Sequence, residues 1–289
     1  MKKLFGFLLV LAMVFGLCVP TLAVNEGQVR AVVGANLDDN QIKAVYEQFG
    51  IERGSVPELT VTNAEERDYL EGLVDESVIG TRSISCVYIK LLEKDDGLAV
   101  TTDNITWCTE DMYRSALMTA GIYDAEVKVG APFGVSGTAA LTGIYKAYED
   151  ITGTVLVEEA KEAAADELVT TAELADEIAE EDAVAIVNEL KLMLDEIAKM
   201  SDEELRQQIN DIVAQYGYTL DEELVNKLIS LCRSLQGLTI ADLQEKVEQF
   251  KSTIETVSHY ADQALTFGQK LAQFIQNLLD AFKNAFGNE

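Results

Sequence analysis

The position of the prolines most constrains the fold of this 289-residue chain. All three lie before Thr152-Gly153, in a part where strand-like and helix-like segments alternate. After Gly153, apolar residues recur at helical spacing almost to the end of the chain. The sequence therefore predicts an α+β fold. A small N-terminal mixed sheet with helices is followed by an all-helical C-terminal region that ends in a long heptad-patterned helix.

The first residues have the layout of a secretory signal peptide. Lys2 and Lys3 precede an uncharged apolar run, and Thr21-Leu22-Ala23 forms a small-x-small cleavage site. The run is marginal as a membrane anchor, because a span needs about 20 apolar residues. We expect a secreted protein, extracellular or associated with the cell wall, without a transmembrane segment after cleavage. The expected units are a signal peptide over 1–23, an α+β domain over 24–153, a helical region over 154–238 and a long amphipathic helix over 239–289.

The formal net charge of the chain is −28 at pH 7. A surface this acidic repels phosphate backbones and anionic lipid head groups, which argues against nucleic acid and acidic membranes as partners. The chain has one histidine, no C-x-x-C pair and no twelve-residue calcium loop, so we predict no metal site and no cofactor. Solubility outside the cell and loose cation binding are both consistent with the charge.

Local signals place the elements of the first part. Thr62 and Glu65 have the form of a capping box, and Gly121 follows a helical stretch. Two strand-like runs flank Asp95-Asp96-Gly97, which is a hairpin turn signal. The predicted helices cover 37–50, 62–74 and 109–121, with a further helix in the stretch 131–149, and the predicted strands lie within 83–108 and over 125–132.

The predicted hairpin brings two cysteines together. Folding the strands about Asp95-Asp96-Gly97 places Cys86 opposite Cys108, where Cβ atoms are close enough for a disulfide. Because an exported protein meets an oxidising environment, we predict this bridge, with two buried thiols as the alternative. Cys232 lies near an apolar helical stripe and is interpreted as a core thiol.

One stretch, from Ala131 to Glu149, comes closest to an active-site motif. Its candidate functional loop consists of Pro132, Ser136, Gly137 and Thr138. A nucleophile elbow requires G-x-S-x-G, but threonine occupies the last position here. The fingerprints of phosphate-binding and dinucleotide-binding loops are absent. We therefore predict a structural role, in which Pro132 ends a strand, Ser136 caps the next helix and Gly137 permits the turn.

A catalytic serine also needs a base. The only histidine, His259, lies in the C-terminal helix, so a Ser-Lys arrangement would have to recruit Lys146 or Lys128. No carboxylate pair of the glycosidase type stands out among the many acids. We predict no catalytic residue. The structural interpretation instead assigns a buried helical stripe to Ala140, Ile144, Ala147 and Ile151, with Gly143 permitting close packing.

Helix boundaries are readable in the second part. Ser201 to Glu204 and Thr219 to Glu222 have capping-box form, and Gly217 and Gly237 fall where helices should end. From Leu243 a heptad-type seam continues to the end of the chain. This last helix either packs in its own bundle, associates with a second copy, or contacts a partner or membrane. Its candidate partner surface consists of Phe267, Leu271, Phe274, Leu278, Phe282 and Phe286.

Four short motifs between Asn104 and Gly143 form a recognisable pattern. They are Asn104-Ile105-Thr106, Thr119-Ala120-Gly121-Ile122, Ala131-Pro132-Phe133 and the nine residues 135–143, VSGTAALTG. With them the chain resembles the YpuA-like family of secreted proteins from Gram-positive bacteria, a domain of unknown function. The resemblance extends from about residue 25 through the helical region and weakens in the terminal tail. It implies an extracytoplasmic, envelope-associated protein, and it implies neither a reaction nor a catalytic residue.

These features together predict a secreted, non-enzymatic binding protein of the cell envelope or the extracellular space, with an unknown ligand. Its expected partner is an envelope component, or a second copy bound through the C-terminal helix. One alternative is a hydrolase that acts on an envelope polymer with Ser136 or a carboxylate pair. The other is an acidic, cation-binding surface protein.

Overall fold

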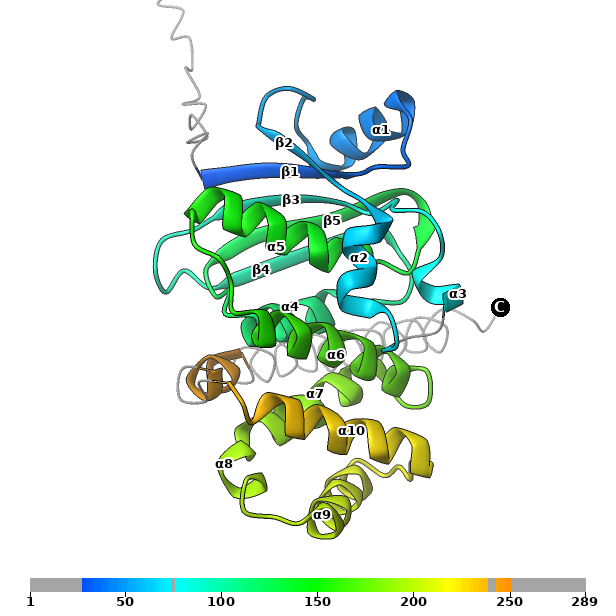
Figure 1. The fold of residues 1–289 in the computed structure, drawn as a ribbon, viewed down its shortest axis with the longest axis vertical. Coiled ribbons are helices and arrows are strands. Elements are labelled where there is room, and N and C mark those ends of the chain that lie inside the picture. Colours follow the sequence, from blue (N-terminus) through cyan, green and yellow to red (C-terminus); the bar gives the residue numbers. More distant parts are fainter. Residues whose placement is uncertain (1–27, 74–75, 239–242, 251–289) are drawn as a thin grey trace, which may run out of the picture.

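The computed structural model describes residues 28–73, 76–238 and 243–250, which combine one sheet with a stack of helices (Figure 1). The strands are β1 (Val29–Gly34), β2 (Glu58–Val61), β3 (Cys86–Leu91), β4 (Leu98–Ile105) and β5 (Ala125–Val135). The helices are α1 (Asp39–Phe49), α2 (Asn63–Leu70), α3 (Glu76–Ile79), α4 (Glu110–Thr119), α5 (Ala139–Thr152), α6 (Glu158–Ala175), α7 (Glu180–Leu192), α8 (Leu194–Ile197), α9 (Asp202–Gln215) and α10 (Glu222–Leu235).

The sheet is mixed, with the strand order β2-β1-β3-β5-β4. β1 runs parallel to β2, and β5 runs parallel to β4, whereas β3 is antiparallel to both of its neighbours. A helix joins each parallel pair, α1 for the first and α4 for the second, because parallel strands need a crossover connection. The predicted α+β class with a mixed sheet is confirmed.

The predicted hairpin about Asp95-Asp96-Gly97 is wrong. The chain does turn there, with φ angles of 70° at Asp95 and 83° at Gly97. However, β5 inserts between the two strands, so that β3 and β4 are not neighbours. The central position buries Val127 and Val129 and provides β5 with a strand on each edge. A local turn signal cannot reveal this insertion, because a later segment of the chain supplies the competing strand.

The structure also does not contain the predicted disulfide between Cys86 and Cys108, since both cysteines are free thiols. Cys86 begins β3 opposite Gly130 of β5 and packs in a small apolar cluster with α1. Cys108 follows β4 and packs in the main core. The insertion of β5 therefore places the two thiols in separate clusters. Cys86 and Cys108 are two buried thiols, which was the alternative to the predicted bridge. Cys232 is buried in the main core, as predicted.

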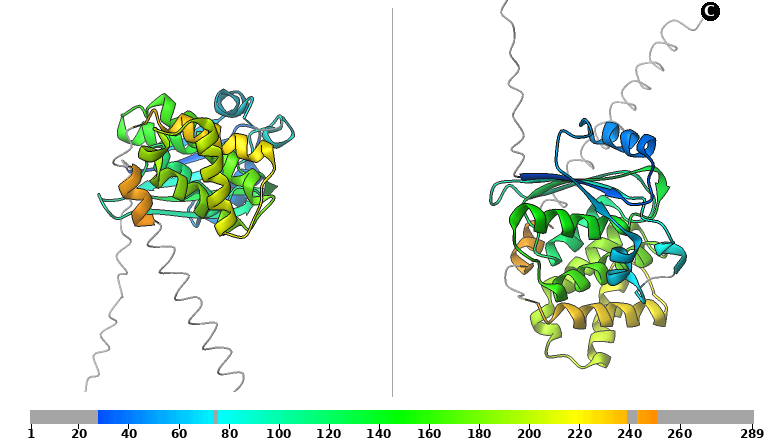
Figure 2. Two further views of the ribbon diagram at one scale, coloured as in Figure 1. Left: turned by 90° about the horizontal axis from the view of Figure 1, so that it is seen from below. Right: turned by 45° about the horizontal axis from the view of Figure 1, so that its top comes forward.

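Alternating side chains of β1 build the two faces of the sheet. Val29, Ala31 and Val33 pack in the small cluster with α1, whereas Val32 joins the main core. Figure 2 shows α1 on one side of the sheet and the helical layers on the other. α1 completes its cluster with an amphipathic face formed by Ile42, Val45, Tyr46 and Phe49.

α5 packs on the main-core face through the predicted stripe. Ala140, Ile144 and Ala147 are buried, and Ile151 is half-buried. A Cβ atom on Gly143 would lie 3.4 Å from side chains of both β1 and β3, so the missing side chain lets the helix approach the sheet closely. The stripe and the close packing are both confirmed.

α6 connects the sheet layer with the later helices. It follows Gly153, which ends α5 with a φ of 66°, and it packs against α4, α7 and α10 (Figure 1). One continuous apolar core extends from Val32 of β1 to Phe250. The sheet layer and the helical region therefore share a core, although their compositions differ.

A buried ion pair crosses this core where α4, α6 and α7 meet. Lys191 of α7 donates to the Oε1 of Glu167 of α6 over 2.8 Å, and the two side chains are 0% and 1% exposed. Lys191 also donates to the carbonyl and hydroxyl oxygens of Ser115 on α4, each over 3.1 Å. Ser115 and Thr119 donate their hydroxyls to the Glu167 carboxylate. Burial lowers the pKa of Lys191, and the Glu167 carboxylate opposes this shift.

The predicted capping boxes are confirmed at two helices and wrong at a third. Thr62 caps α2 and Ser201 caps α9, each with the reciprocal glutamate contact. α10 is capped instead by Asp221, whose carboxylate accepts the backbone N–H of Leu224 over 2.9 Å. Thr219 is therefore not the cap, because an aspartate two residues later is an equally favourable capping residue.

Residues 243–250 are helical and dock on the rest of the protein. Leu243, Val247 and Phe250, the first positions of the predicted seam, are buried in the main core. The guanidinium of Arg114 lies 5.3 Å from the centroid of the Phe250 ring. The start of the seam thus packs within its own chain. The later part of the predicted helix, including the candidate partner surface Phe267, Leu271, Phe274, Leu278, Phe282 and Phe286, lies outside the described residues.

Lys191→Met should lower the free energy of unfolding by about 3–5 kcal/mol, because it leaves the Glu167 carboxylate buried without its cation. The double variant Glu167→Gln, Lys191→Met should recover most of this loss, since a neutral amide oxygen still accepts hydroxyl hydrogen bonds. Urea unfolding followed by circular dichroism at pH 7 measures both.

Lys227→Met is the matched control, because Lys227 pairs with Glu173 of the same helix α6 at a more exposed position. It should cost less than about 1 kcal/mol. A loss equally small for Lys191→Met would contradict the structural role of the buried pair.

The three described cysteines should be unreactive in the native protein. Burial raises the pKa of each thiol to about 12, so almost no thiolate is present at pH 8. Iodoacetamide should leave Cys86, Cys108 and Cys232 unmodified in the folded protein and modify all three in denaturant. Peptide mass spectrometry without reduction measures this, and a peptide pair linked through Cys86 and Cys108 would rule out the described strand order.

Candidate functional site

The ends of β4 and β5 lie side by side and carry the loop that the sequence singled out. The backbone N–H of Thr106 donates to the carbonyl of Val135 over 2.9 Å, and that of Cys108 donates to the carbonyl of Ser136 over 3.1 Å. These bonds join the segment that leads into α4 to the segment that leads into α5. Two of the motifs that carry the family resemblance therefore meet in space.

Asn104 marks a backbone irregularity at this junction. Its φ is 58°, and the register between β4 and β5 shifts between Asp103 and Ile105. The side-chain amide of Asn104 donates to the carbonyl of Ala131 over 2.9 Å. Asparagine adopts left-handed backbone more readily than most residues, and such bulges occur often beside functional sites. The strand pattern in the sequence does not indicate this bulge.

Pro132 does not end the strand as predicted. β5 continues to Val135, and Pro132 lies inside it, beyond Gly130, the last residue of β5 that is paired with β3. Proline has no N–H to donate, so a strand tolerates it at a bulge or where a neighbouring strand has ended. Pro132 therefore marks the point where β5 extends past β3.

Gly137 turns the backbone between β5 and α5, as predicted, with a φ of 100°. A Cβ atom at this position would lie 2.4 Å from the hydroxyl oxygen of Tyr113 and 2.5 Å from a methyl carbon of Ile105. Glycine is the residue that fits this space and this conformation. The buried Tyr113 hydroxyl donates to the Gly137 carbonyl over 2.5 Å. α4 thus holds the loop in place.

Ser136 does not cap α5. The helix begins at Ala139 after Thr138, and the Thr138 side chain makes no bond to a helix N–H. The Thr138 hydroxyl donates instead to the Oε1 of Glu66 over 3.3 Å. The Oγ of Ser136 lies 3.4 Å from the Oγ1 of Thr138. The fold therefore places the loop hydroxyls beside a buried carboxyl group.

These groups line a pocket of about 160 Å³, hereafter the Ser136 pocket. α2 and α3 contribute residues to it, as do the segment before β3 and the loop before α5. It combines one acid, one base and three hydroxyl groups with four apolar residues, and ligand sites typically carry a few placed polar groups of this kind. The lining residues are Glu66, Ile79, Arg82, Ile84, Ser85, Val135, Ser136, Thr138 and Ala139.

Glu66 is the chemically distinctive group of the pocket. The residue is 1% exposed, and its carboxylate accepts a hydrogen bond from the side-chain amide of Asn63 over 3.2 Å and another from Thr138. Burial raises the pKa of this carboxyl to about 7, against the opposing effects of those hydrogen bonds and the Arg67 guanidinium. Shifts of this kind cluster at functional sites. Nothing in the sequence singles out Glu66, because beside the capping Glu65 it is one more acid in an acidic helix.

Arg82 brings a cation to the same pocket. It is exposed, and its guanidinium donates to the carbonyl of Asn36 over 2.8 Å. Among the described residues, each of the six other arginines forms an ion pair with a carboxylate, whereas Arg82 forms none. The chain contains 50 acidic residues, so this lack of an acidic partner is unusual. A guanidinium in such a position has donors available for an external carboxylate.

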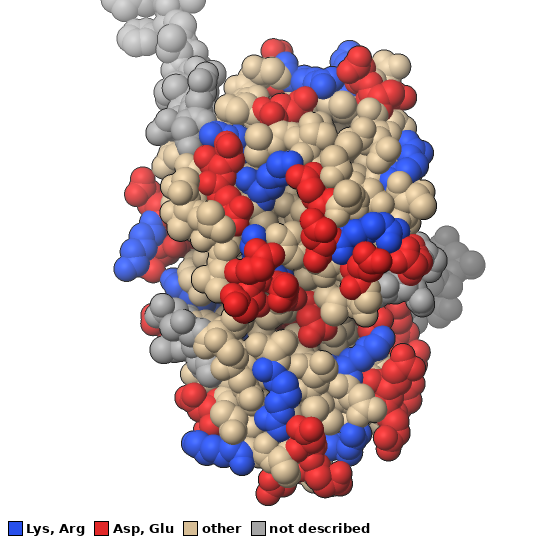
Figure 3. Space-filling view, viewed as in Figure 1, with Lys and Arg blue, Asp and Glu red and all other residues tan. Residues whose placement is uncertain are grey.

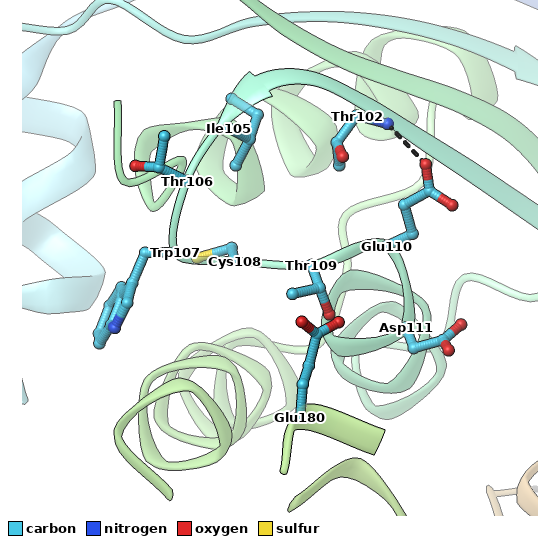
Figure 4. A pocket seen from close by; sticks show the side chains of 9 residues that line it. All are labelled: Thr102, Ile105, Thr106, Trp107, Cys108, Thr109, Glu110, Asp111 and Glu180. Carbon is cyan, nitrogen blue, oxygen red and sulfur yellow. Dashed lines mark hydrogen bonds between the residues drawn. The ribbon is translucent and has the colours of Figure 1, made fainter. Parts of the chain in front are cut away.

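A second hollow, of about 390 Å³, lies beside the start of α4 (Figure 4). Its polar groups are held by the fold. Glu110 accepts the backbone N–H of Thr102 over 3.1 Å, and the Trp107 indole N–H donates to Asp176 over 3.1 Å. Figure 4 shows the Trp107 and Glu110 side chains pointing in different directions. The Ser136 pocket is therefore the stronger candidate, since it holds a buried acid and a base without a described acidic partner.

The bases considered from the sequence have other contacts. Lys146 donates to the carbonyl of Thr60 over 2.7 Å, and Lys128 donates to the carbonyl of Phe49 over 3.0 Å. His259 lies outside the described residues. The titratable group that the fold brings to the loop is instead a carboxyl from α2.

Comparison with known proteins identifies the family. Residues 33–256 match the family model described as "Protein of unknown function (DUF1002)", a range that includes every residue of the Ser136 pocket. The chain belongs to the DUF1002 family. It is 34% identical to "Uncharacterized protein YpuA" of Bacillus subtilis (strain 168) over 295 residues, which cover 99% of this chain and 100% of the relative. The YpuA-like resemblance is thereby confirmed. No solved structure matches the chain.

Two further findings concern the described part of this DUF1002 protein. None of the helices in that part is both long enough and apolar enough to span a bilayer. Nor do His, Cys, Asp and Glu side chains gather there in a group of three or more that could hold a metal ion.

Ionisation of Glu66 should destabilise the folded protein. Because its pKa is raised in the folded state from an ordinary value of 4.5 to about 7, the native state binds the proton more tightly than the unfolded state. Stability should therefore fall as the pH rises from about 4.5 to about 7, by roughly 3 kcal/mol in total. Glu66→Gln should remove this part of the pH dependence.

Urea unfolding of both proteins at pH 5, 6, 7 and 8 measures the difference. Glu66→Gln should gain stability over the natural protein as the pH rises, whereas the exposed neighbour Glu71→Gln, as a control, should follow the natural protein. A constant offset between Glu66→Gln and the natural protein across this range would refute the raised pKa.

Proposed function

We propose that this DUF1002 protein is exported and binds a component of the cell envelope, without catalysing a reaction. The signal-peptide layout of residues 1–23 supports export. The observation that most supports binding is the Ser136 pocket, where a buried acid and an arginine share one small hollow. Polar groups fixed in a pocket with apolar walls are the usual basis of small-molecule recognition.

The hydroxyl that contacts the buried acid favours binding over nucleophilic catalysis. The Glu66 carboxylate accepts a hydrogen bond from Thr138, which is itself 1% exposed. A nucleophilic hydroxyl requires a general base within hydrogen-bond reach. Thr138, the hydroxyl beside the acid, is too buried to attack a polymer.

The surface charge limits the class of partner. Figure 3 shows acidic side chains in groups on the viewed face, with basic side chains interspersed among them. With a net charge of −28, the protein repels polyanions at long range. Neutral, zwitterionic or cationic envelope components are therefore the expected ligands.

Export and retention are tested together in a bacterium that expresses the full chain. The exported form should begin at Val24, as measured by N-terminal sequencing of the protein recovered from the envelope and medium fractions. Purified protein should bind to isolated cell envelopes, and the double variant Glu66→Gln, Arg82→Gln should bind at least tenfold less. Arg206→Gln, which changes a half-buried arginine of α9 that does not line the Ser136 pocket, is the control and should bind like the natural protein. Equal binding by all three proteins would exclude the pocket as the binding site.

One observation favours the hydrolase alternative. Ser136 lies in the same pocket as a carboxyl whose pKa is raised to about 7, a value suited to a general base. A fluorophosphonate probe distinguishes the two functions. Labelling of Ser136 that disappears in Ser136→Ala would establish the hydrolase, whereas the binding function predicts no labelling. No observation on the described residues singles out the cation-binding alternative.

A further inference from the structure

The Ser136 pocket contains two opposite charges that are not paired with each other. Glu66 and Arg82 both line it, yet no ion pair joins them. Glu66 comes from α2, and Arg82 comes from the segment between α3 and β3, so the fold positions the two groups independently. A ligand that carried both an anionic and a cationic group could satisfy both at once.

Each charge has hydrogen-bonding capacity left for a ligand. The Glu66 carboxylate accepts one bond from Asn63 and one from Thr138, out of about four that a carboxylate can accept. The Arg82 guanidinium has five N–H groups, and the Asn36 carbonyl occupies one nitrogen. Because the carboxyl of Glu66 has a pKa of about 7, an approaching ammonium group converts it to the carboxylate at little cost near neutral pH.

The size and the walls of the pocket limit the ligand further. The pocket volume of about 160 Å³ is smaller than the roughly 300–1,000 Å³ of pockets that hold drug-sized ligands, so it suits a molecule of a few heavy atoms. The side chains of Ile79, Ile84, Val135 and Ala139 form the apolar part of the lining. They suit a ligand whose remaining group is small and apolar.

We propose that the Ser136 pocket binds the zwitterionic α-amino acid group of a small ligand, with the ammonium group at Glu66 and the carboxylate at Arg82. This inference rests on the proposed binding function and names the ligand class for that site. An anion alone makes no use of the Glu66 carboxylate, and it meets the repulsion of the acidic surface. A cation alone leaves Arg82 unmatched. The α-amino acid is the smallest common molecule that carries both groups on one carbon.

Isothermal titration calorimetry of the purified full-length protein at pH 7 tests this with three matched probes: alanine, propionate and ethylammonium. Propionate lacks the amino group of alanine, and ethylammonium lacks its carboxylate. Alanine should bind at least tenfold more tightly than either. Both enantiomers of alanine are titrated, because the pocket can prefer either configuration. The enantiomer that binds more tightly is compared with propionate and ethylammonium. Binding of propionate or ethylammonium as tight as that of alanine, or no binding of any probe up to 50 times the protein concentration at millimolar protein, would overturn the proposal.

Two variants locate the charges of the ligand. Arg82→Gln should weaken alanine binding at least tenfold and leave the weak ethylammonium binding unchanged. Glu66→Gln should weaken alanine at least tenfold and leave propionate binding unchanged or slightly tighter. Arg82 is exposed, so its variant tests the proposal even if Glu66→Gln alters folding. Arg206→Gln is the control and should bind alanine normally. Unchanged alanine affinity in Arg82→Gln would refute the assignment.

The two proposals fail in different ways. If the protein binds envelopes through Glu66 and Arg82 but does not bind alanine, the amino-acid inference is wrong and the proposed function stands. If it binds alanine with the expected variant pattern but does not bind envelopes, the ligand class is correct and the envelope role is wrong.

Discussion

The ion pair between Lys191 and Glu167 is the constraint on which the arrangement of this protein depends. A buried charge costs several kcal/mol unless a partner and hydrogen bonds compensate it. Here the compensation comes from three helices, because α7 supplies the cation, α6 the anion and α4 the hydroxyls of Ser115 and Thr119. Apolar packing alone tolerates small shifts between helices. The hydrogen bonds of this network, in contrast, are all formed in one relative position of α4, α6 and α7. It therefore sets how the helical layers meet the sheet layer.

The same helix α4 links this network to the candidate site. Through Ser115 and Thr119 it contacts the buried pair, and through the Tyr113 hydroxyl it holds the carbonyl of Gly137. The Ser136 loop is thus attached to the most constrained part of the core. Recognition sites benefit from such support, because polar groups that are already in position lose little freedom when a ligand binds. This support makes the pocket a better guide to the function of this DUF1002 protein than any motif.

Sequence signals were reliable where the interaction is local. The capping boxes at Thr62 and Ser201, the turn at Gly97 and the stripe of α5 depend on residues a few positions apart, and all are present. Apart from the cap of α10, where Asp221 replaces the predicted Thr219, the main errors share a different cause. The hairpin and the Cys86–Cys108 bridge both assumed that consecutive strands are neighbours, and β5 separates them. Ser136 and Pro132 were assigned local roles, but the first lines a pocket with an acid from α2, and the second lies where β3 has ended.

The sequence by itself determined the α+β class, the positions of most helices and turns, the acidic surface and the family, because these follow from composition, periodicity and short motifs. Tertiary structure alone decided the strand order, the free state of the thiols and the composition of the Ser136 pocket. The physical reason is the distance along the chain. Glu66, Arg82 and Ser136 come from three separate segments, and no pattern within one segment encodes their approach. Burial then changes the acidity of Glu66. Its carboxyl would have an ordinary pKa in an exposed helix, and it acquires a pKa of about 7 because the fold removes it from water.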